Sequence, residues 1–351
     1  PYLAYLYRLG LMRILIIGPS WVGDSVMAQS LYKRLKSEDP SCQIDVLAPS
    51  WSLPLLTRMS EIKDSIKSPF IHGDFKPLAR YRFAQTIKES CYDRAILLTN
   101  SLKSSLIPFF ADIPIRTGWL GEVRYGLVND IRVLDENIQY LMIEKFSALS
   151  INKMDYQLAN LSFPSLTVDS DNQALKFKLF NINPHLPTIG ICPGAEFGPA
   201  KKWPASYYAE VALNYIEKGW NVICFGSEND EQTGVEICKE NGLSKSKNFH
   251  NIIGKTDLLD AIDLLSFCKI VVTNDSGLMH IAAAVGTPLV ALYGPSSPEY
   301  TPPLINQKVV IRKMDGYDRT RSGDLESGHH SSLLSIKPDE VMNALKGLWD
   351  S

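Results

Sequence analysis

Short apolar runs alternate with segments of helical periodicity along most of the chain. Nearly uniform apolar runs of this length predict strands buried on both faces, and strands that alternate with helices predict parallel sheets covered by helices on both sides. The predicted strands are residues 13–17, 43–47, 61–65, 94–99, 188–192, 221–225, 251–253, 270–272 and 289–293. The predicted helices are residues 26–36, 52–59, 75–89, 102–110, 136–150, 205–218, 228–241, 258–267, 278–284 and 338–349.

The alternation weakens once, between about residues 160 and 187, where Ser, Asp, Asn and Pro are frequent. The pattern therefore predicts two Rossmann-like, doubly wound α/β domains at 12–165 and 187–335, joined by a linker at 166–186. Residues 336–351 are expected to form a helix that packs back toward the N-terminal domain. Residues 1–11 are expected to precede the natural start at Met12. Doubly wound domains bind ligands at the carboxyl ends of their strands, so we expect the two to face each other across a cleft.

Composition narrows the class of protein. The chain has 351 residues, 45% of them hydrophobic, and 36 Lys and Arg against 38 Asp and Glu. This balance gives no electrostatic reason to expect nucleic acid as a partner. The six cysteines show neither a CxxC pair nor zinc spacing, which predicts reduced thiols in a cytoplasmic protein. No apolar stretch approaches the roughly 20 residues of a transmembrane helix.

The loop after the first predicted strand contains a candidate base. Gly18-x4-Gly23 resembles the start of a phosphate-binding loop, but Asp24 occupies the lysine position and would repel a nucleotide's phosphates. A GxGxxG fingerprint is also absent. Two interpretations of Asp24 stay open at this stage: a helix cap, or a general base kept ionised at a helix N-terminus.

Three predicted strand ends in the second domain carry polar residues. Lys201 and Lys202 precede a helix and suit a diphosphate, although most such pairs are solvated. Glu228 could accept hydrogen bonds from ribose or cap its helix. The third loop, residues 275–277, opens a helix that carries His280, and it presents free backbone N–H groups unless Asp275 or Ser276 is merely a cap. Together these loops favour a nucleotide-diphosphate ligand.

Residues 17–24, 193–204 and 274–280 resemble the bacterial ADP-heptose:lipopolysaccharide heptosyltransferases of glycosyltransferase family 9, most of all the type II members. The resemblance runs from Met12 to the C-terminus. It implies a GT-B glycosyltransferase that binds ADP-L-glycero-β-D-manno-heptose on its C-terminal domain. The acceptor would be heptosyl-Kdo2-lipid A, which meets the N-terminal domain, and the product an α-1,3 link formed with inversion.

The resemblance also implies roles for individual residues. The catalytic base falls on Asp24. Donor contacts fall on Lys201, Lys202, Glu228, Asp275, Ser276, Gly277, Leu278 and His280. The resemblance assigns the acceptor side poorly, and the candidates there are Ser20, Trp21, Arg80, Arg116 and Arg124, the arginines for anions of lipid A or Kdo although surface arginines are common. Leu120 stands where relatives are expected to carry a basic residue. The only D-x-D spelling considered, residues 169–171, lies in the predicted linker, so no tightly bound metal is expected, while stimulation by Mg²⁺ stays open.

Such an acceptor is a membrane lipid, so we expect peripheral contact with the cytoplasmic face of the inner membrane. Three alternatives remain at this stage. A type I heptosyltransferase would act on Kdo2-lipid A. A GT-B sugar-nucleotide epimerase would need an acid and a base on both sides of one sugar, and only Asp24 is clear. A non-enzymatic nucleotide-binding module would leave Asp24 dispensable.

Overall fold

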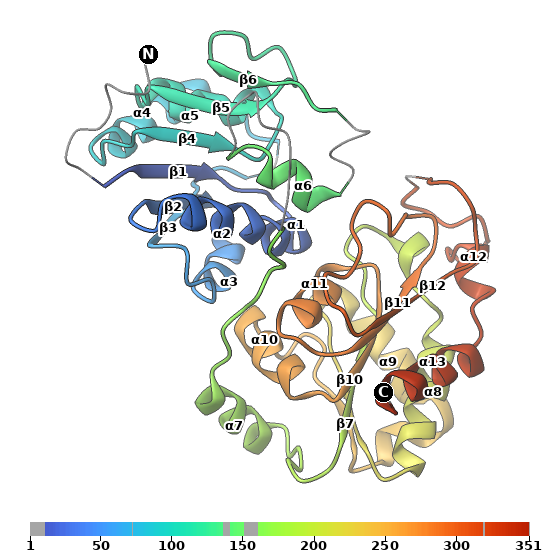
Figure 1. The fold of residues 1–351 in the computed structure, drawn as a ribbon. Helices are drawn as coiled ribbons and strands as arrows, with labels where there is room; N and C mark the ends of the chain where they lie inside the picture. The colour runs from blue at the N-terminus through green and yellow to red at the C-terminus, as the bar shows by residue number, and fades with distance from the viewer. Residues whose placement is uncertain (1–10, 72, 136–140, 151–160, 319, 351) are drawn as a thin grey trace. The chain divides into compact units, whose positions relative to one another are not determined.

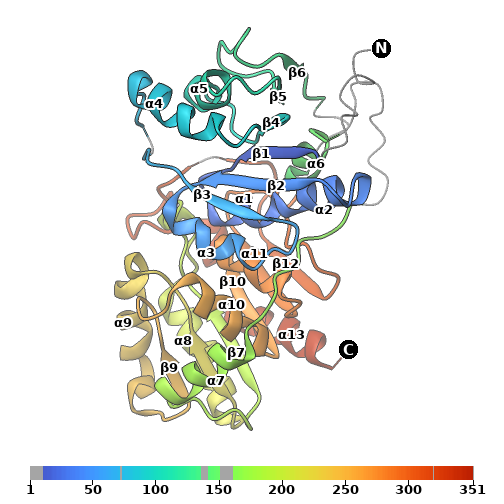
Figure 2. The ribbon, with the colours of Figure 1, turned by 90° about the vertical axis from the view of Figure 1, so that its left-hand side faces the viewer.

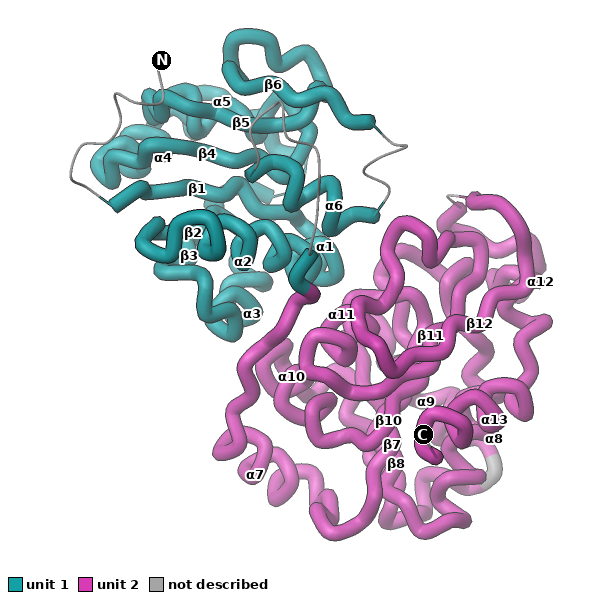
Figure 3. Tube along the Cα trace, viewed as in Figure 1, with its two compact units in different colours: residues 1–162 teal, residues 163–351 magenta. Residues whose placement is uncertain are grey.

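The computed structural model describes residues 11–71, 73–135, 141–150, 161–318 and 320–350. The chain divides into two compact units, residues 1–162 and 163–351 (Figure 3). Each unit contains its own parallel sheet, and each is described by itself below. The extension expected at residues 1–11 falls almost entirely outside the described residues.

The first unit is built on a six-stranded parallel sheet with the order β3-β2-β1-β4-β5-β6. Helices α4 and α5 pack together on one face, and α1, α2 and α6 lie on the other (Figures 1 and 2). The strands are β1 (Arg13–Ile17), β2 (Gln43–Ala48), β3 (Asp64–Lys67), β4 (Arg94–Leu97), β5 (Ile115–Trp119) and β6 (Asp130–Arg132). The helices are α1 (Val22–Met27), α2 (Gln29–Glu38), the 3-10 turn η2 (Ser50–Ser52), α3 (Leu53–Leu56), α4 (Pro77–Lys88), α5 (Leu102–Phe110) and α6 (Met142–Ser147).

The second unit repeats this topology, with the order β12-β11-β10-β7-β8-β9. Helices α10 and α11 lie on one face of its sheet, and α8, α9 and α13 on the other (Figure 1). The strands are β7 (Thr188–Cys192), β8 (Asn221–Cys224), β9 (Phe249–Asn251), β10 (Ile270–Asn274), β11 (Leu289–Tyr293) and β12 (Lys308–Arg312). The helices are α7 (Ser170–Leu179), α8 (Ala205–Glu217), α9 (Glu231–Lys239), α10 (Leu258–Phe267), α11 (Gly277–Ala284), α12 (Ser331–Leu334) and α13 (Pro338–Trp349), with 3-10 turns η3 (Pro199–Lys201), η4 (Glu228–Asp230) and η5 (Glu240–Lys245).

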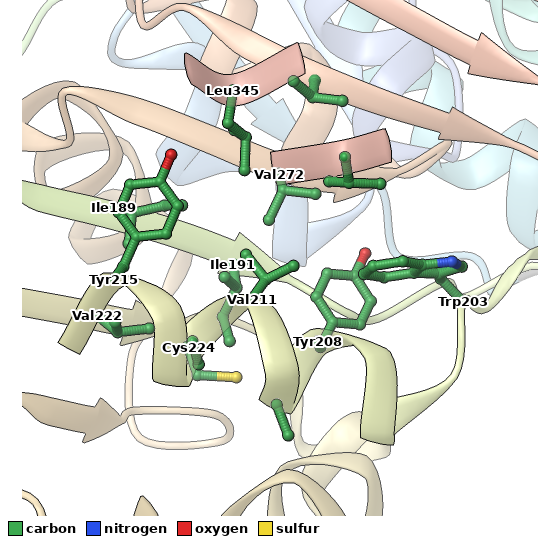
Figure 4. Packing of buried hydrophobic residues seen from close by; sticks show 14 of the residues in the cluster. Ile189, Ile191, Trp203, Tyr208, Val211, Tyr215, Val222, Cys224, Val272 and Leu345 are labelled. Atoms are coloured by element: carbon green, nitrogen blue, oxygen red, sulfur yellow. The ribbon is translucent and has the colours of Figure 1, made fainter. Parts of the chain in front are cut away.

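The predicted terminal helix belongs to the core of the second unit. Helix α13 packs on α8 and on strands β10 to β12 of its own unit. Its apolar face places Val341 and Leu345, both 0% exposed, in the core formed by Ile191, Val211 and Val272 (Figure 4). The helix therefore completes the second unit's hydrophobic core, which is why its apolar residues recur at helical spacing.

The segment predicted as a linker contains a helix. Residues 166–186 contain α7, whose N-terminus is capped by Asp169 through hydrogen bonds from the backbone N–H groups of Asp171 and Asn172. The helix packs on α10, where the Phe177 and Phe267 ring centroids are 4.5 Å apart. Polar composition suggested a linker because α7 has no buried residue of its own, so its sequence lacks the apolar stripe that marks a core helix.

Three strands were not predicted. Strands β5, β6 and β12 contain polar residues or glycine, and they lie toward the edges of their sheets, where uniform apolar runs are not required. The predicted helix at 136–150 is shorter, since α6 begins at Met142, and residues 136–140 lie outside the described residues. The remaining predicted strands and helices are present with small shifts of their ends, which confirms the α/β class.

Candidate active site

Each sheet reverses its winding at one pair of strands. In the first unit this switch point lies between β1 and β4, and in the second between β7 and β10. The loops that leave these strands diverge to opposite sides and create a ligand-binding crevice at the carboxyl ends. Asp24 follows β1, whereas Lys201 and Asp275 follow β7 and β10. The predicted catalytic and donor residues therefore occupy the switch points of the two sheets.

Asp24 lies in the first turn of α1 and is half-buried. Trp21 precedes the helix in extended conformation, and the backbone N–H of Ser25 closes the first turn on the Trp21 carbonyl at 2.9 Å. The loop leaves β1 close against the end of β2, because a Cβ on Gly18 would lie 3.2 Å from the Leu47 carbonyl oxygen. Backbone N–H groups at the first turn of a helix favour an ionised carboxylate, which is the form that a general base needs.

Lys201 is placed by an unusual backbone turn. Gly198 has φ of +150°, and a Cβ there would lie 2.4 Å from the Arg321 carbonyl oxygen, so a larger residue would disrupt the turn. That carbonyl accepts the backbone N–H of Ala200 at 3.2 Å, within the 3-10 turn that ends at Lys201. The Lys201 Nζ then reaches Asp275 Oδ2 at 2.5 Å, so one ion pair joins the loops after β7 and β10.

A buried amide fixes the two loops to each other. The Asn274 Oδ1 accepts the Trp203 backbone N–H at 3.1 Å and the Tyr208 hydroxyl at 3.0 Å. The Asn274 Nδ2 donates to the Pro193 carbonyl at 2.7 Å. Trp203 and Tyr208 belong to the core shown in Figure 4. A fully satisfied buried network of this kind is rigid, and it holds the loop that carries Lys201 against the end of β10.

Helix α11 begins at Gly277, directly after the ion pair. The Ser276 Oγ, at the N-terminus of this helix, is enclosed and has no hydrogen-bond partner among the described residues. His280 lies one turn further on, 5% exposed. Burial lowers the pKa of His280 to about 4, an effect that Asp275 opposes and Lys201 reinforces. His280 is therefore neutral at physiological pH, and Leu278 is half-buried beside it.

The second lysine has a different partner. The Lys202 Nζ lies 2.8 Å from Asp230 Oδ1, and Asp230 is 6% exposed. Both residues line a recess of about 300 Å³, together with Ala195, Glu196, Gly198, Pro199 and Asn229. The Asn229 Nδ2 donates to Glu196 across the loops, 3.2 Å from either carboxylate oxygen. Glu228 is exposed at the start of the same turn, next in sequence to Asn229, which lines the recess.

The arginines predicted to contact the acceptor donate hydrogen bonds to backbone carbonyls of the first unit. Arg80 is 5% exposed, donates to the carbonyls of Asp74 and Phe75, and lies over the Phe70 ring. Arg116 donates to the carbonyls of Ile113, Gly126 and Leu127. Arg124, 3% exposed, donates to the carbonyls of Thr99 and Trp119. These contacts give all three a structural role, whereas Ser20 and Trp21 are exposed in the loop before Asp24.

Three further observations bear on cofactors, redox state and membranes. In the described part of the chain, no group of three or more His, Cys, Asp or Glu side chains could hold a metal ion. All six cysteines are free thiols. Among the described residues, no helix has the length and hydropathy of a membrane span.

Sequence reasoning missed Asp230, Phe197 and Arg321. Ser227 and Asp230 have capping-box spacing, a signal that could have marked Asp230 as an organising residue. The Lys201 Nζ and the Arg321 guanidinium lie 5.1 Å and 5.3 Å from the centroid of the Phe197 ring. No local pattern predicts that contact, because Arg321 is far away in the sequence.

Two doubly wound units, each with polar residues at its switch point, are the architecture of the GT-B glycosyltransferases. Residues 80–327 match the model of glycosyltransferase family 9 (heptosyltransferase), and the chain belongs to this family. The lipopolysaccharide heptosyltransferase 2 of Salmonella typhimurium is 48% identical over 342 residues, which cover 96% of this chain and 98% of the relative. The lipooligosaccharide heptosyltransferase 2 of Haemophilus influenzae is 48% identical over 345 residues, which cover 96% of this chain and 99% of the relative. The structure of the Escherichia coli ADP-heptose lps heptosyltransferase II has a TM-score of 0.88 and 44% identity, covering 96% of this chain and 98% of that one.

Proposed function

We propose that this protein transfers a heptose from ADP-heptose to the heptose of heptosyl-Kdo2-lipid A, forming an α-1,3 link in the lipopolysaccharide inner core. The observation that carries the proposal is the Lys201–Asp275 ion pair at the N-terminus of α11, at the switch point of the second sheet. It occurs in a chain that is nearly half identical to curated heptosyltransferases 2 over almost its full length.

In this proposal the second unit binds the ADP moiety. An ammonium group has three N–H donors, so Asp275 can orient Lys201 while another donor reaches a diphosphate oxygen. The backbone N–H groups at the start of α11 and the enclosed Ser276 hydroxyl supply further donors. Asp275 acts through Lys201, because a carboxylate directly against the diphosphate would repel it. Glu228 faces the ribose from the turn after β8.

Transfer then needs one base and a stabilised leaving group. Asp24 removes the proton from the 3-hydroxyl of the acceptor heptose as that oxygen attacks the anomeric carbon of the donor. The bond from the anomeric carbon to ADP breaks, and ADP leaves with the electron pair from the opposite face, so the configuration inverts. Lys201 and the N-terminus of α11 stabilise the negative charge that develops on the leaving diphosphate. The first unit thus supplies the base and the second holds the leaving group.

The acceptor is a membrane lipid, so the first unit is proposed to contact the cytoplasmic face of the inner membrane. The support for this membrane contact is a set of exposed large apolar side chains in the loops that leave the carboxyl ends of four strands. Ile71 and Val123 are 75% and 76% exposed. The others are Trp21, Trp51, Phe75, Leu120 and Tyr125. Apolar and aromatic side chains at one edge suit the boundary between lipid headgroups and acyl chains.

The deciding experiment offers ADP-heptose to purified acceptors that bear zero, one or two heptoses, with and without EDTA. The proposal expects product only from the acceptor with one heptose, and transfer that persists in EDTA even if Mg²⁺ stimulates it. Product from the acceptor without heptose would indicate a type I enzyme. A change of the sugar without acceptor would indicate an epimerase, and binding without any turnover would indicate a nucleotide-binding module.

The role of Asp24 has its own test. Asp24→Asn removes the base but keeps the shape of the side chain, so kcat should fall by about 10²- to 10⁴-fold, the range for loss of a general base. The affinity for ADP should stay within about twofold, because the donor residues belong to the second unit. Asp171→Asn, which removes a first-turn acid from α7, is the control and should leave kcat unchanged. Full activity of Asp24→Asn would make Asp24 a structural residue.

A further inference from the structure

We propose that Lys202 and Asp230 form a positioning pair that shapes the nucleoside side of the donor pocket, and that Lys202 is not a second phosphate ligand. This inference rests on the proposed function, because it concerns the same donor site. It changes the role expected for Lys202 from the sequence, where its position beside Lys201 suggested a shared contact with the diphosphate.

The two adjacent lysines point to different strand ends. Lys201 pairs with Asp275 after β10, whereas Lys202 pairs with Asp230 at the end of the turn that follows β8. Both pairs are largely buried: Lys202 and Asp230 retain side-chain exposures of 21% and 8%. One loop after β7 is therefore held on both sides, toward β10 by the first lysine and toward β8 by the second.

Asp230 organises the turn on which Glu228 and Asn229 lie. Its Oδ1 accepts from Lys202, and its Oδ2 accepts from Ser227 twice, from the backbone N–H at 3.2 Å and from the hydroxyl at 3.0 Å. This capping box fixes the start of the 3-10 turn η4, which opens the approach to α9. A single buried carboxylate thus sets the geometry of the turn and joins it to the loop that carries both lysines.

Two glycines make room for this carboxylate. A Cβ on Gly194 would lie 2.3 Å from Asp230 Oδ2 and 2.6 Å from its Cγ, which is closer than real Cβ atoms approach. A Cβ on Gly226 would lie 3.1 Å from the Asp230 Cβ. The Asp230 side chain must seat directly against the backbone after β7, so even an alanine at position 194 would displace it.

Further contacts fix the direction of Lys202. Its ammonium group is directed to Asp230 after β8, whereas Lys201 is directed to Asp275 at the N-terminus of α11, and separating a buried pair of this kind leaves an uncompensated charge. The Lys202 backbone carbonyl is 2.9 Å from His329 Nδ1, so the pair also adjoins the segment that carries Arg321 and His329. The lysine is held from both its backbone and its side chain, as expected of a structural support.

The two roles of Lys202 predict different ligand dependences. A positioning pair fixes the wall of the pocket that faces the nucleoside, so breaking the pair should weaken the binding of ADP and of adenosine by the same factor. A lysine that binds phosphate contacts only the diphosphate, so its loss should weaken the binding of ADP and leave the binding of adenosine unchanged. The test measures the affinities of ADP and adenosine for the full-length chain carrying Lys202→Met or Asp230→Asn.

We expect each variant to bind ADP and adenosine more weakly by a common factor of about ten- to a hundredfold. This is the usual effect of removing a group that orients a site. The KM for ADP-heptose should rise in parallel, with kcat within about threefold. The double variant should be no worse than either single one, because both remove the same interaction. Gly194→Ala should reproduce the pattern. If a variant fails to fold, Lys202→Gln, which keeps the polar tip, gives the same comparison.

The second unit contains a closely matched control. Lys176 and Asp260 are also 2.8 Å apart, with side-chain exposures of 22% and 7%. Asp260 also belongs to a capping box, accepting the Asp257 backbone N–H at 3.2 Å. Asp260→Asn should therefore lower thermal stability as Asp230→Asn does while leaving both ligand affinities unchanged.

Three results would overturn the inference: weaker ADP binding with unchanged adenosine binding in Lys202→Met, unchanged affinities in Asp230→Asn, or an equal effect of Asp260→Asn. None of these depends on sugar transfer. Normal ADP binding without heptose transfer in the unaltered protein would contradict the proposed function and leave the positioning pair standing.

Discussion

His280 is a buried histidine that stays neutral because burial lowers its pKa to about 4. Its unfolded value is 6.5. Between these values the unfolded chain binds a proton that the folded chain does not, so stability falls as the pH drops from about 6.5 toward about 4. The neutral ring lies beside the Lys201–Asp275 pair and adds no positive charge there.

We predict that His280→Gln reduces the acid sensitivity of the second unit. At pH 5 the unaltered histidine should cost about 2 kcal/mol relative to neutral pH, a cost that glutamine cannot incur because it does not titrate. Thermal unfolding at pH 7.5 and pH 5.0 measures this as a smaller change in Tm for the variant. Equal changes in Tm for the two proteins would show that His280 titrates normally in the folded state.

At the scale of elements, α13 is an integral part of the second unit. Leu345 is fully buried against the sheet, and the helix also contacts α8 (Figure 4). An amphipathic helix at the end of a chain is easily assigned to any neighbouring domain, because its apolar stripe shows that it is buried but not against what.

Leu345→Ala should lower the free energy of unfolding by about 2–5 kcal/mol, the usual cost of removing a large side chain from a packed core. Asn343→Ala, at an exposed position of the same helix, should change it by less than about 0.5 kcal/mol. Denaturant titration of both variants measures the difference. Equal stability of the two variants would mean that α13 contributes little to the core.

At the scale of the whole molecule, the exposed apolar residues are distributed in a way that permits a direct test of membrane contact. Ile71 and Val123 belong to the first unit, and Leu175 and Leu179 on α7 of the second unit are 63% and 64% exposed. The two pairs are similarly apolar and exposed, and only the first follows strands of the sheet that carries Asp24.

We predict that the double variant Ile71→Ser, Val123→Ser binds vesicles of anionic and zwitterionic phospholipid more weakly than the unaltered protein, by about fivefold or more, because two exposed apolar side chains that would enter the lipid are lost. The matched double variant Leu175→Ser, Leu179→Ser should bind as the unaltered protein does. Co-sedimentation with vesicles measures both. Equal loss in the two variants would assign the binding to general hydrophobicity and remove the proposed membrane surface.

The sequence by itself determined the central strands, most of the helices and the strand ends that carry polar residues. Uniform apolar runs predicted the central strands, and the polar loops after them predicted Asp24, Lys201 and Asp275 as site residues, since parallel strands bring their carboxyl ends to one edge. These inferences depend on burial and periodicity, which are properties of short segments.

Only the tertiary structure decided which side chains pair. Adjacent Lys201 and Lys202 have the same local chemistry, but Lys201 pairs with Asp275 and Lys202 with Asp230. Arg80 and Arg124 resemble surface anion ligands in sequence, but each is buried against backbone carbonyls of its own unit. The physical reason is the same throughout. The role of a charged side chain depends on the groups that the fold brings within hydrogen-bond distance of it, and most of those groups lie far away along the chain.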